Sequence, residues 1–188
     1  MDTVTSTILN LILVIALVLL NGFFVSAEFA LVKVRTTRIA QIMTKRGRMA
    51  QTVLKSLDAY LSATQLGITL ASLGLGWVGE PTLAKILEPI FHTFDMPEWL
   101  NHTISFVIAF SVITFLHIVL GEMAPKSLAI RRSETTTLWT VTPLHWFYIV
   151  FKPFITALNS SANQILKWIG IELQDDHQQV HPEEEIKM

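Results

Sequence analysis

The sequence predicts an all-α polytopic membrane protein with three transmembrane helices and juxtamembrane amphipathic helices on the cytoplasmic side. The chain has 188 residues, of which 51% are hydrophobic and only 15% are charged, whereas soluble domains usually carry about 25% charged residues. Three apolar stretches are long enough to cross a bilayer core of about 30 Å. Lys and Arg residues are concentrated between the first and second of these stretches.

The first predicted span covers residues 5–32. The chain starts with Met1, Asp2 and Thr3, without a basic region, and its apolar run is too long for a cleaved signal peptide. We therefore expect a retained helix. It carries four polar residues within its apolar length: Asn10, Asn21, Ser26 and Glu28.

Residues 33–57 form a basic, amphipathic connection whose apolar stripe can lie against anionic headgroups. The second predicted span covers residues 59–78, and we expect Gly79, Glu80 and Pro81 to end it. A short amphipathic helix over residues 83–91 follows in the second connection, whose charges are mostly acidic.

The third predicted span covers residues 104–124 and is followed by Lys126, Arg131 and Arg132. Seven Lys and Arg residues lie between the first two spans, and one, Lys85, lies between the last two. The positive-inside rule therefore predicts a multi-pass protein of the cell membrane with its N-terminus outside and its C-terminus in the cytoplasm.

The remaining residues predict two further regions after a three-helix transmembrane domain over residues 1–132. Residues 133–170 contain two apolar and aromatic stripes, which favour two juxtamembrane helices over a fourth span. Residues 171–188 are polar and predict a linker or tail, and their helix-like ending at Met188 suggests a truncated chain.

The second span carries two distinct faces. Ser62, Gln65, Thr69 and Ser72 share one polar face, which predicts either interhelical hydrogen bonds or a polar path. Small residues form the other face, which permits close helix contact and is a candidate dimer surface. Its members are Ala63, Gly67, Ala71 and Gly74.

The end of the third span combines a proline with a carboxylate. Pro125 has no N–H and clashes with the carbonyl four residues earlier, which belongs to Gly121. We therefore expect a helix end where a free Gly121 carbonyl lies beside the Glu122 carboxylate. Such irregular backbone is a recurrent cation ligand in membranes, while the alternative is an ordinary helix end where Glu122 pairs with Lys126.

The polar residues of the first span support a cation site. Asn21 and Glu28 are seven residues apart and share one helix face, and ionisable groups inside a membrane usually mark ion paths. The alternative for Glu28 is contact with water or with Lys126. These groups are hard oxygen donors, which suit Mg²⁺, Ca²⁺ or Na⁺, and we interpret His117 as a hydrogen-bonded core residue.

Three stretches resemble the membrane domain of the CorC/CNNM (cyclin M) family of magnesium transporters. They are Leu20–Leu31, Tyr60–Leu70 and Leu120–Lys126, the last with the pattern Gly-Glu-x-x-Pro-Lys. The resemblance implies three transmembrane helices, a homodimer and a dehydrated Mg²⁺ held between the helices. It also implies a regulatory CBS-domain pair after the membrane part, which this chain does not contain. By matching positions, it implies a metal site formed by Asn21, Ser26, Gln65, Gly67, Gly121 and Glu122.

The leading hypothesis is a Mg²⁺ transporter, with export and Na⁺ coupling as family expectations. The alternative is a membrane Mg²⁺ sensor or scaffold that does not transport. The chain has no Cys, which excludes disulfides and thiolate metal sites, and it has no basic patch of the kind that binds nucleic acid. The catalytic motifs of the common hydrolase and phosphate-binding families are missing, so we do not expect an enzyme. The expected partners are membrane lipids, Mg²⁺, Na⁺ and a second copy of the chain.

Overall fold

The computed structural model describes residues 3–91 and 97–170, and every regular element in those ranges is helical. The predicted tail over residues 171–188 lies outside the described residues. In chain order the elements are α1 (Thr3–Lys33), α2 (Thr36–Ala40), α3 (Lys45–Lys55), α4 (Leu57–Phe91), α5 (Glu98–Leu116), the π-helical segment η2 (His117–Met123), α6 (Ala124–Arg131) and α7 (Ser133–Trp168).

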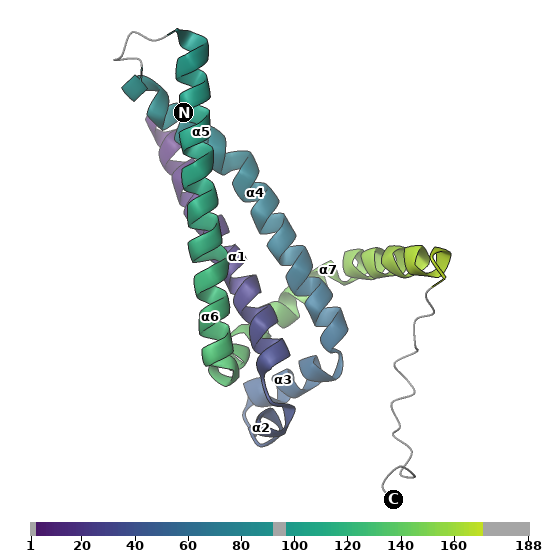
Figure 1. Ribbon diagram of the computed structural model, residues 1–188. Helices are drawn as coiled ribbons and strands as arrows, with labels where there is room; N and C mark the ends of the chain where they lie inside the picture. Colours follow the sequence, from purple (N-terminus) through teal and green to yellow (C-terminus); the bar gives the residue numbers. More distant parts are fainter. Residues whose placement is uncertain (1–2, 92–96, 171–188) are drawn as a thin grey trace, which may run out of the picture.

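Three helices are long and apolar enough to cross a membrane, which confirms the predicted fold class. They cover Val4–Lys33, Leu57–Phe91 and Glu98–Arg131, the last formed by α5, η2 and α6 as one continuous rod. These three spans lie side by side (Figure 1), with α4 packed against both α1 and α5. We call the two ends of this bundle the α4–α5 end and the α2–α3 end.

The second span is longer than the sequence predicted. We expected Pro81 to end the helix, but α4 continues through Pro81 and Pro89 to Phe91 and takes in the short helix predicted over residues 83–91. The hydroxyl of Thr82 donates a hydrogen bond to the carbonyl of Val78 at 2.6 Å. Packing of α4 against α5 offsets the backbone hydrogen bond that Pro81 cannot make.

The third span also continues past its predicted end. The expected helix end at Pro125 is wrong, because η2 leads directly into α6, where Pro125 occupies the first turn. A proline is tolerated there because the first N–H groups of a helical segment need no partner within it. The wider π-helical turn of η2 accommodates the break in the α-helical hydrogen-bond pattern, so the chain passes from π-helix to α-helix without leaving the helical conformation.

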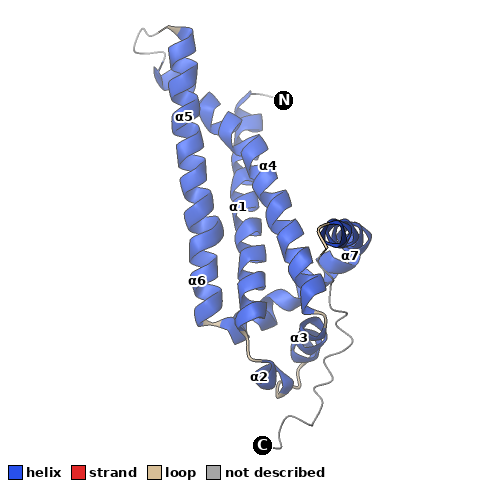
Figure 2. Cartoon of the chain, turned by 45° about the vertical axis from the view of Figure 1, so that its right-hand side comes forward, coloured by secondary structure: helices blue, strands red, loops and turns tan. Residues whose placement is uncertain are grey.

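The segment after the spans forms one helix where two were expected. Helix α7 runs through Pro143 and Pro153, and both apolar stripes lie along it. It is not among the three candidate spans. Its first half packs across the side of α1 and α4 near the α2–α3 end, and its second half projects sideways from the spans (Figures 1 and 2). Burial of Val141 and Leu144 in the first half stabilises the helix on both sides of Pro143.

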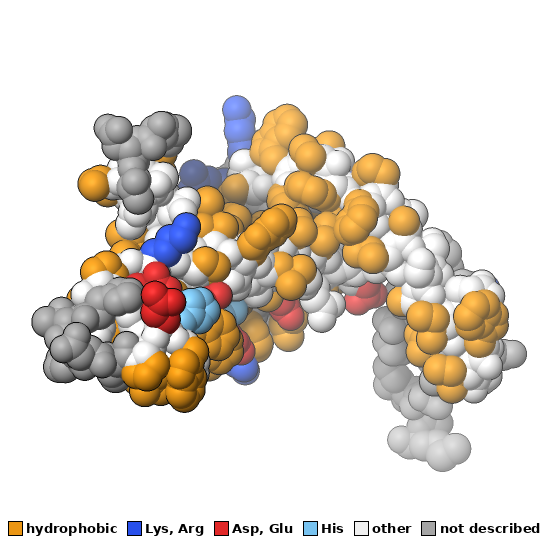
Figure 3. All heavy atoms as spheres, turned by 90° about the horizontal axis from the view of Figure 1, so that it is seen from above, with side chains coloured by type: hydrophobic (Ala, Val, Ile, Leu, Met, Phe, Trp, Pro, Cys, Tyr) orange, Lys and Arg blue, Asp and Glu red, His pale blue; other side chains and the backbone are white. Residues whose placement is uncertain are grey.

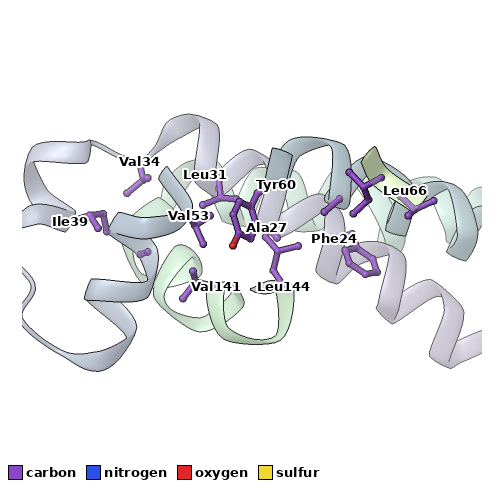
Figure 4. Packing of buried hydrophobic residues seen from close by; sticks show 13 residues of the cluster. Phe24, Ala27, Leu31, Val34, Ile39, Val53, Tyr60, Leu66, Val141 and Leu144 are labelled. Carbon is purple, nitrogen blue, oxygen red and sulfur yellow. The ribbon is translucent and has the colours of Figure 1, made fainter. Parts of the chain in front are cut away.

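The largest apolar core lies at the α2–α3 end, where α1, α3, α4 and α7 meet (Figure 4). Ile39 and Val53, from the predicted amphipathic stripe, are fully buried in it, whereas Met43 remains exposed. Most of that stripe therefore packs against protein. Two polar contacts add to this core: Arg38 forms an ion pair with Glu134 at 3.0 Å, and the Tyr60 hydroxyl lies 2.7 Å from His145 Nδ1.

The small-residue face of α4 packs against α1 of the same chain. A Cβ atom on Gly67 would lie 2.5 Å from the ring of Phe24, and one on Gly74 would lie 3.3 Å from Leu17. Ala63 and Ala71 on the same face are buried. This face, a candidate dimer surface from the sequence, therefore joins two spans within one chain.

Candidate functional site

A connected group of polar residues lies between the three spans. Asn21 comes from α1, Ser72 from α4, and His117 and Gly121 from η2; we call these four residues the central polar cluster. The Asn21 amide nitrogen donates to the Gly121 carbonyl at 2.9 Å, and the Ser72 hydroxyl donates to the Asn21 amide oxygen at 3.1 Å. His117 Nε2 lies 3.2 Å from the Ser72 hydroxyl. All three spans thus take part in a single network.

The direction of the hydrogen bonds in this cluster follows from a count of protons. The Ser72 hydroxyl has one proton, which it donates to Asn21. The hydroxyl oxygen also lies 3.2 Å from His117 Nε2, and in the tautomer with a proton on Nε2 the His117 ring donates to it. In that tautomer every bond points along one path, from His117 through Ser72 and Asn21 to the Gly121 carbonyl.

Two glycines let α1 approach the third span closely enough for these bonds. A Cβ atom on Gly121 would lie 3.0 Å from the His117 ring and 3.2 Å from the Asn21 amide nitrogen. On the α1 side, a Cβ atom on Gly22 would lie 3.0 Å from the Pro125 ring. Because any side chain would push the helices apart, the absence of a Cβ at both positions brings the backbone carbonyl of η2 within reach of Asn21.

The π-helical geometry of η2 supplies the irregular backbone that the sequence predicted near Pro125. Its seven residues, His117–Met123, include both η2 members of the central polar cluster. Single π-helical turns inside α-helices occur frequently at functional sites. The Gly121 carbonyl, which we expected to be free beside Glu122, instead accepts a hydrogen bond from the Asn21 side chain.

The structure brings together only part of the site predicted from the sequence. Asn21 and Gly121 are in direct contact. Ser26, further along α1, donates a long bond of 3.5 Å to the Pro125 carbonyl, so it borders the same helix pair. Gly67 is buried beneath the Phe24 ring, where it serves the packing of α1 on α4.

Gln65 and Glu122 lie apart from the cluster in this conformation. Gln65 is exposed and lines a cavity of about 280 Å³ between α4 and the second half of α7. The Glu122 side chain is exposed on the surface of the single chain and makes no hydrogen bond or ion pair with the described residues. The alternative ion pair of Glu122 with Lys126 is not formed among the described residues. The Lys126 ammonium lies instead 4.4 Å from the centre of the Phe29 ring.

Two members of the cluster were not assigned to the site from the sequence. Ser72 was recognised only as part of a polar helix face, and His117 only as a hydrogen-bonded core residue, which its contact with Ser72 confirms. The sequence contained one indication that His117 belongs to the site: His117 and Gly121 are four residues apart and therefore share a helix face.

The donor set limits what the cluster can bind. Among the described residues, no group of three His, Cys, Asp or Glu side chains is close enough to hold a metal ion. Any ion at the cluster would instead meet amide, hydroxyl and carbonyl oxygens. Neutral oxygens of this kind suit hard cations such as Mg²⁺, Ca²⁺ and Na⁺.

Comparison with known proteins identifies the family. The family model described as "Cyclin M transmembrane N-terminal domain" matches residues 12–188. The chain is 46% identical to UPF0053 protein YugS and 47% identical to UPF0053 protein YrkA, both from Bacillus subtilis, over 96% and 97% of its length. It is 37% identical to the uncharacterized protein Rv1841c of Mycobacterium tuberculosis over 94% of its length. It covers 43% of each Bacillus relative and 50% of the mycobacterial one. The chain therefore belongs to the cyclin M transmembrane domain family.

Proposed function

We propose that this domain transports Mg²⁺ across the cell membrane, and that the cation passes through the central polar cluster. The observation that carries the proposal is the contact of the Asn21 amide with the Gly121 carbonyl inside a π-helical segment. Family membership supports it. In lipid, backbone carbonyls freed from regular helix geometry occur where they line a cavity or coordinate an ion.

In the conformation described, the Gly121 carbonyl and the Asn21 amide oxygen accept hydrogen bonds from other members of the cluster and are not free to bind an ion. A Mg²⁺ ion requires near-octahedral oxygen coordination at about 2.0–2.1 Å. For the ion to bind, the Asn21 N–H must therefore leave the Gly121 carbonyl, and the Asn21 amide oxygen must turn from Ser72 toward the ion. Because the turn of the Asn21 amide needs only rotation of its side chain, the same groups can satisfy one another when the ion has left.

Glu122 supplies the negative charge that the neutral cluster lacks. Ionisable groups inside a membrane are unfavourable and usually have a functional role, so we propose that another state of the domain uses the charge of Glu122. Successive residues of an α-helix are about 100° apart around its axis, because one turn takes 3.6 residues. Movement of the π turn along the third span would rotate Glu122 toward the Gly121 side, and we propose that this register change accompanies ion binding.

The wider arrangement is part of the same proposal. We propose that the α2–α3 end lies in the cytoplasm and the α4–α5 end outside, because the basic residues are concentrated at the α2–α3 end. We propose that two copies of the chain form a dimer, in keeping with the family resemblance, and that Mg²⁺ is exported with Na⁺ as the coupling ion. Ser26 and Gln65 would then contact the ion on its way to and from the cytoplasm.

The experiment that tests the function is Mg²⁺ flux in liposomes with the purified chain and a fluorescent Mg²⁺ indicator. We expect flux with the unchanged chain and none with Glu122→Gln, which removes the charge and keeps the shape of the side chain. Glu134→Gln is the matched control, because its exposed ion pair with Arg38 is worth about 0–1 kcal/mol.

The rival function, a membrane Mg²⁺ sensor or scaffold, predicts a different result. A sensor binds Mg²⁺, so its thermal stability rises with added Mg²⁺ while the liposomes show no flux. Flux of the unchanged chain at the level of empty liposomes would therefore favour the sensor. Full flux in Glu122→Gln would remove this carboxylate from the mechanism.

A further inference from the structure

An apolar groove lies on the outer side of the bundle, where α1, the third span and α7 meet. Its volume is about 500 Å³, and its lining residues are apolar apart from Ser26. Gly22 is buried at its base, while Leu120, Leu128 and Trp139 stand beside it, each of them more than half exposed. The hollow forms because Gly22 has no side chain to fill the space between these larger residues.

The groove follows the half of the spans that is nearer to the α2–α3 end. On α1 it extends to Ser26, about 10 Å before the helix ends at Lys33, and on the third span it runs for about 12 Å from Leu120 to Leu128. The flanks of the bundle carry mainly hydrophobic side chains, as lipid-facing surfaces do (Figure 3). At this depth in a bilayer an apolar groove takes hydrocarbon and not water, because a buried water needs two or more polar partners.

Both helices that form the groove lead from it to basic residues at the α2–α3 end. Arg131 is three residues beyond Leu128 on the same helix face, and the next residue, Arg132, donates its N–H to the Leu128 carbonyl at 2.9 Å. On α1, Lys33 lies seven residues after Ser26, two turns further along the same face. All three basic side chains are exposed, and none forms an ion pair within the described parts of the chain.

The two ends of the bundle differ in charge. The α4–α5 end includes Glu80, Glu88 and Glu98 against a single lysine among its described residues, and acidic and histidine side chains gather on the surface seen from this end (Figure 3). At the α2–α3 end, the Glu134 carboxylate is already paired with Arg38 at 3.0 Å. An anionic headgroup is therefore attracted to the α2–α3 end and repelled at the α4–α5 end.

We propose that the groove binds one acyl chain of an anionic phospholipid, whose phosphate is held by Arg131, Arg132 and Lys33. The guanidinium groups of the two arginines offer paired N–H donors that match phosphate oxygens. The long side chains of all three residues reach from the helix ends to the headgroup level while their carbon stems stay against apolar surface. The apolar groove and the basic residues thus bind the two parts of one amphipathic ligand.

The groove is placed to influence the central polar cluster. Gly22 directly follows Asn21 in the chain, and Leu120 directly precedes Gly121. A Cβ atom on Gly22 would lie 3.0 Å from the Pro125 ring, so α1 and the third span touch at the base of the groove. An acyl chain seated there stabilises the close spacing of the two helices. Its effect on transport rests on the proposed function, whereas the binding of the lipid does not.

Trp139 reports directly on what fills the groove. In the test variant Phe replaces the other four Trp residues of the chain, and the protein is placed in phosphatidylcholine vesicles. Phosphatidylglycerol with brominated acyl chains is then added in increasing fractions, because bromine quenches Trp fluorescence on contact. Brominated phosphatidylcholine at the same fractions is the neutral lipid. A variant that keeps only Trp77, which is 85% exposed on α4, is the control for ordinary lipid contact.

We expect phosphatidylglycerol to quench Trp139 severalfold more than phosphatidylcholine at low fractions, and to saturate, while both lipids quench Trp77 equally. The double change Arg131→Gln and Arg132→Gln should remove this preference at Trp139. Arg46→Gln with Arg48→Gln removes the same charge from exposed positions of α3 and should leave it unchanged. The unchanged chain gives a second measurement, because phosphatidylglycerol added in detergent should raise its melting temperature more than that of the Arg131 and Arg132 double variant.

Equal quenching of Trp139 by the two lipids would overturn the site, as would a preference that the Arg131 and Arg132 changes leave intact. Protection of Trp139 from both lipids would also overturn it, because the groove would then be covered by protein, such as a second copy of the chain. None of these readouts needs flux. Selective quenching of Trp139 in a chain that shows no Mg²⁺ flux would keep the lipid site and reject the transport function.

Discussion

Asn21 is the residue on which the central polar cluster depends, because it uses both ends of its amide. Its nitrogen donates to the third span and its oxygen accepts from the second. At 2% exposure it is shielded from lipid, and loss of its side chain would leave the Gly121 carbonyl and the Ser72 hydroxyl without these partners. An amide side chain can donate and accept in this way at a single position because it carries both an NH₂ group and a carbonyl oxygen.

Replacement of this amide by an apolar group of similar size should impair transport more than folding. We predict that Asn21→Leu weakens Mg²⁺ binding by about 10- to 100-fold, the range seen when groups that support a metal site are removed. Binding is measured by the rise of the melting temperature in detergent with Mg²⁺ concentration. Asn10→Leu, in the same helix but away from the cluster, should bind Mg²⁺ as the unchanged chain does.

A single methyl group at Gly121 tests the close approach of α1. In Gly121→Ala, the new Cβ would lie 3.0 Å from the His117 ring and 3.2 Å from the Asn21 nitrogen, so one of these side chains must move. We predict that Mg²⁺ flux falls strongly while the chain remains folded in detergent. Unchanged flux in this variant would show that the Asn21–Gly121 contact is not part of the ion path.

At the scale of elements, the sequence predicted where the helices lie better than how they end. The length of the apolar stretches and the charge distribution were sufficient to predict three spans, and the three long apolar helices of the structure confirm that prediction. Proline was misleading at Pro81 and Pro125, because contacts from neighbouring spans keep both helices continuous. The π turn of η2 was not predictable, since its extra residue per turn is stabilised by contacts with Asn21 of another helix. For the same reason neither Ser72 and His117 nor the contact of Asn21 with the Gly121 carbonyl could be assigned.

The packing of α4 on α1 can be tested with two glycines in one helix. Gly67→Ala would place a methyl group 2.5 Å from the Phe24 ring, and such overpacking usually destabilises by about 1–3 kcal/mol. A Cβ atom on Gly76 would meet no neighbouring atom within 4 Å, so Gly76→Ala should not lower stability. We predict a lower melting temperature in detergent for Gly67→Ala only, and equal values for the two variants would contradict the helix packing.

At the scale of the whole molecule, α7 joins α1, α3 and α4 near the α2–α3 end. There Tyr60 of α4 contacts His145 at 2.7 Å and packs against the ring of Tyr148. A change in the tilt of the spans would therefore be transmitted to α7 through a packed core. The sequence indicated an amphipathic segment here, but its single helix and its docking depend on contacts between residues 85 positions apart.

The Tyr60 contact gives a measurable prediction for this link. Tyr60→Phe removes one hydroxyl and leaves the His145 nitrogen without its partner, which should lower the free energy of unfolding by about 1–3 kcal/mol. We expect a lower melting temperature in detergent and faster proteolysis within residues 133–168. Tyr148→Phe, whose hydroxyl makes no such contact among the described residues, is the matched control. Equal stability of the two variants would show that the hydroxyl does not hold α7 in place.

The position of the bound ion decides whether the central polar cluster is the ion path. Crystals of the chain grown with Mn²⁺, a hard-cation substitute for Mg²⁺ with measurable anomalous scattering, would show the ion as a peak in an anomalous difference map. We predict a peak between α1, α4 and η2, in direct contact with the Gly121 carbonyl and the Asn21 amide oxygen, which Mg²⁺ in excess removes. A map with ordered Mn²⁺ only on the surface, and the Asn21–Gly121 hydrogen bond intact, would contradict this prediction.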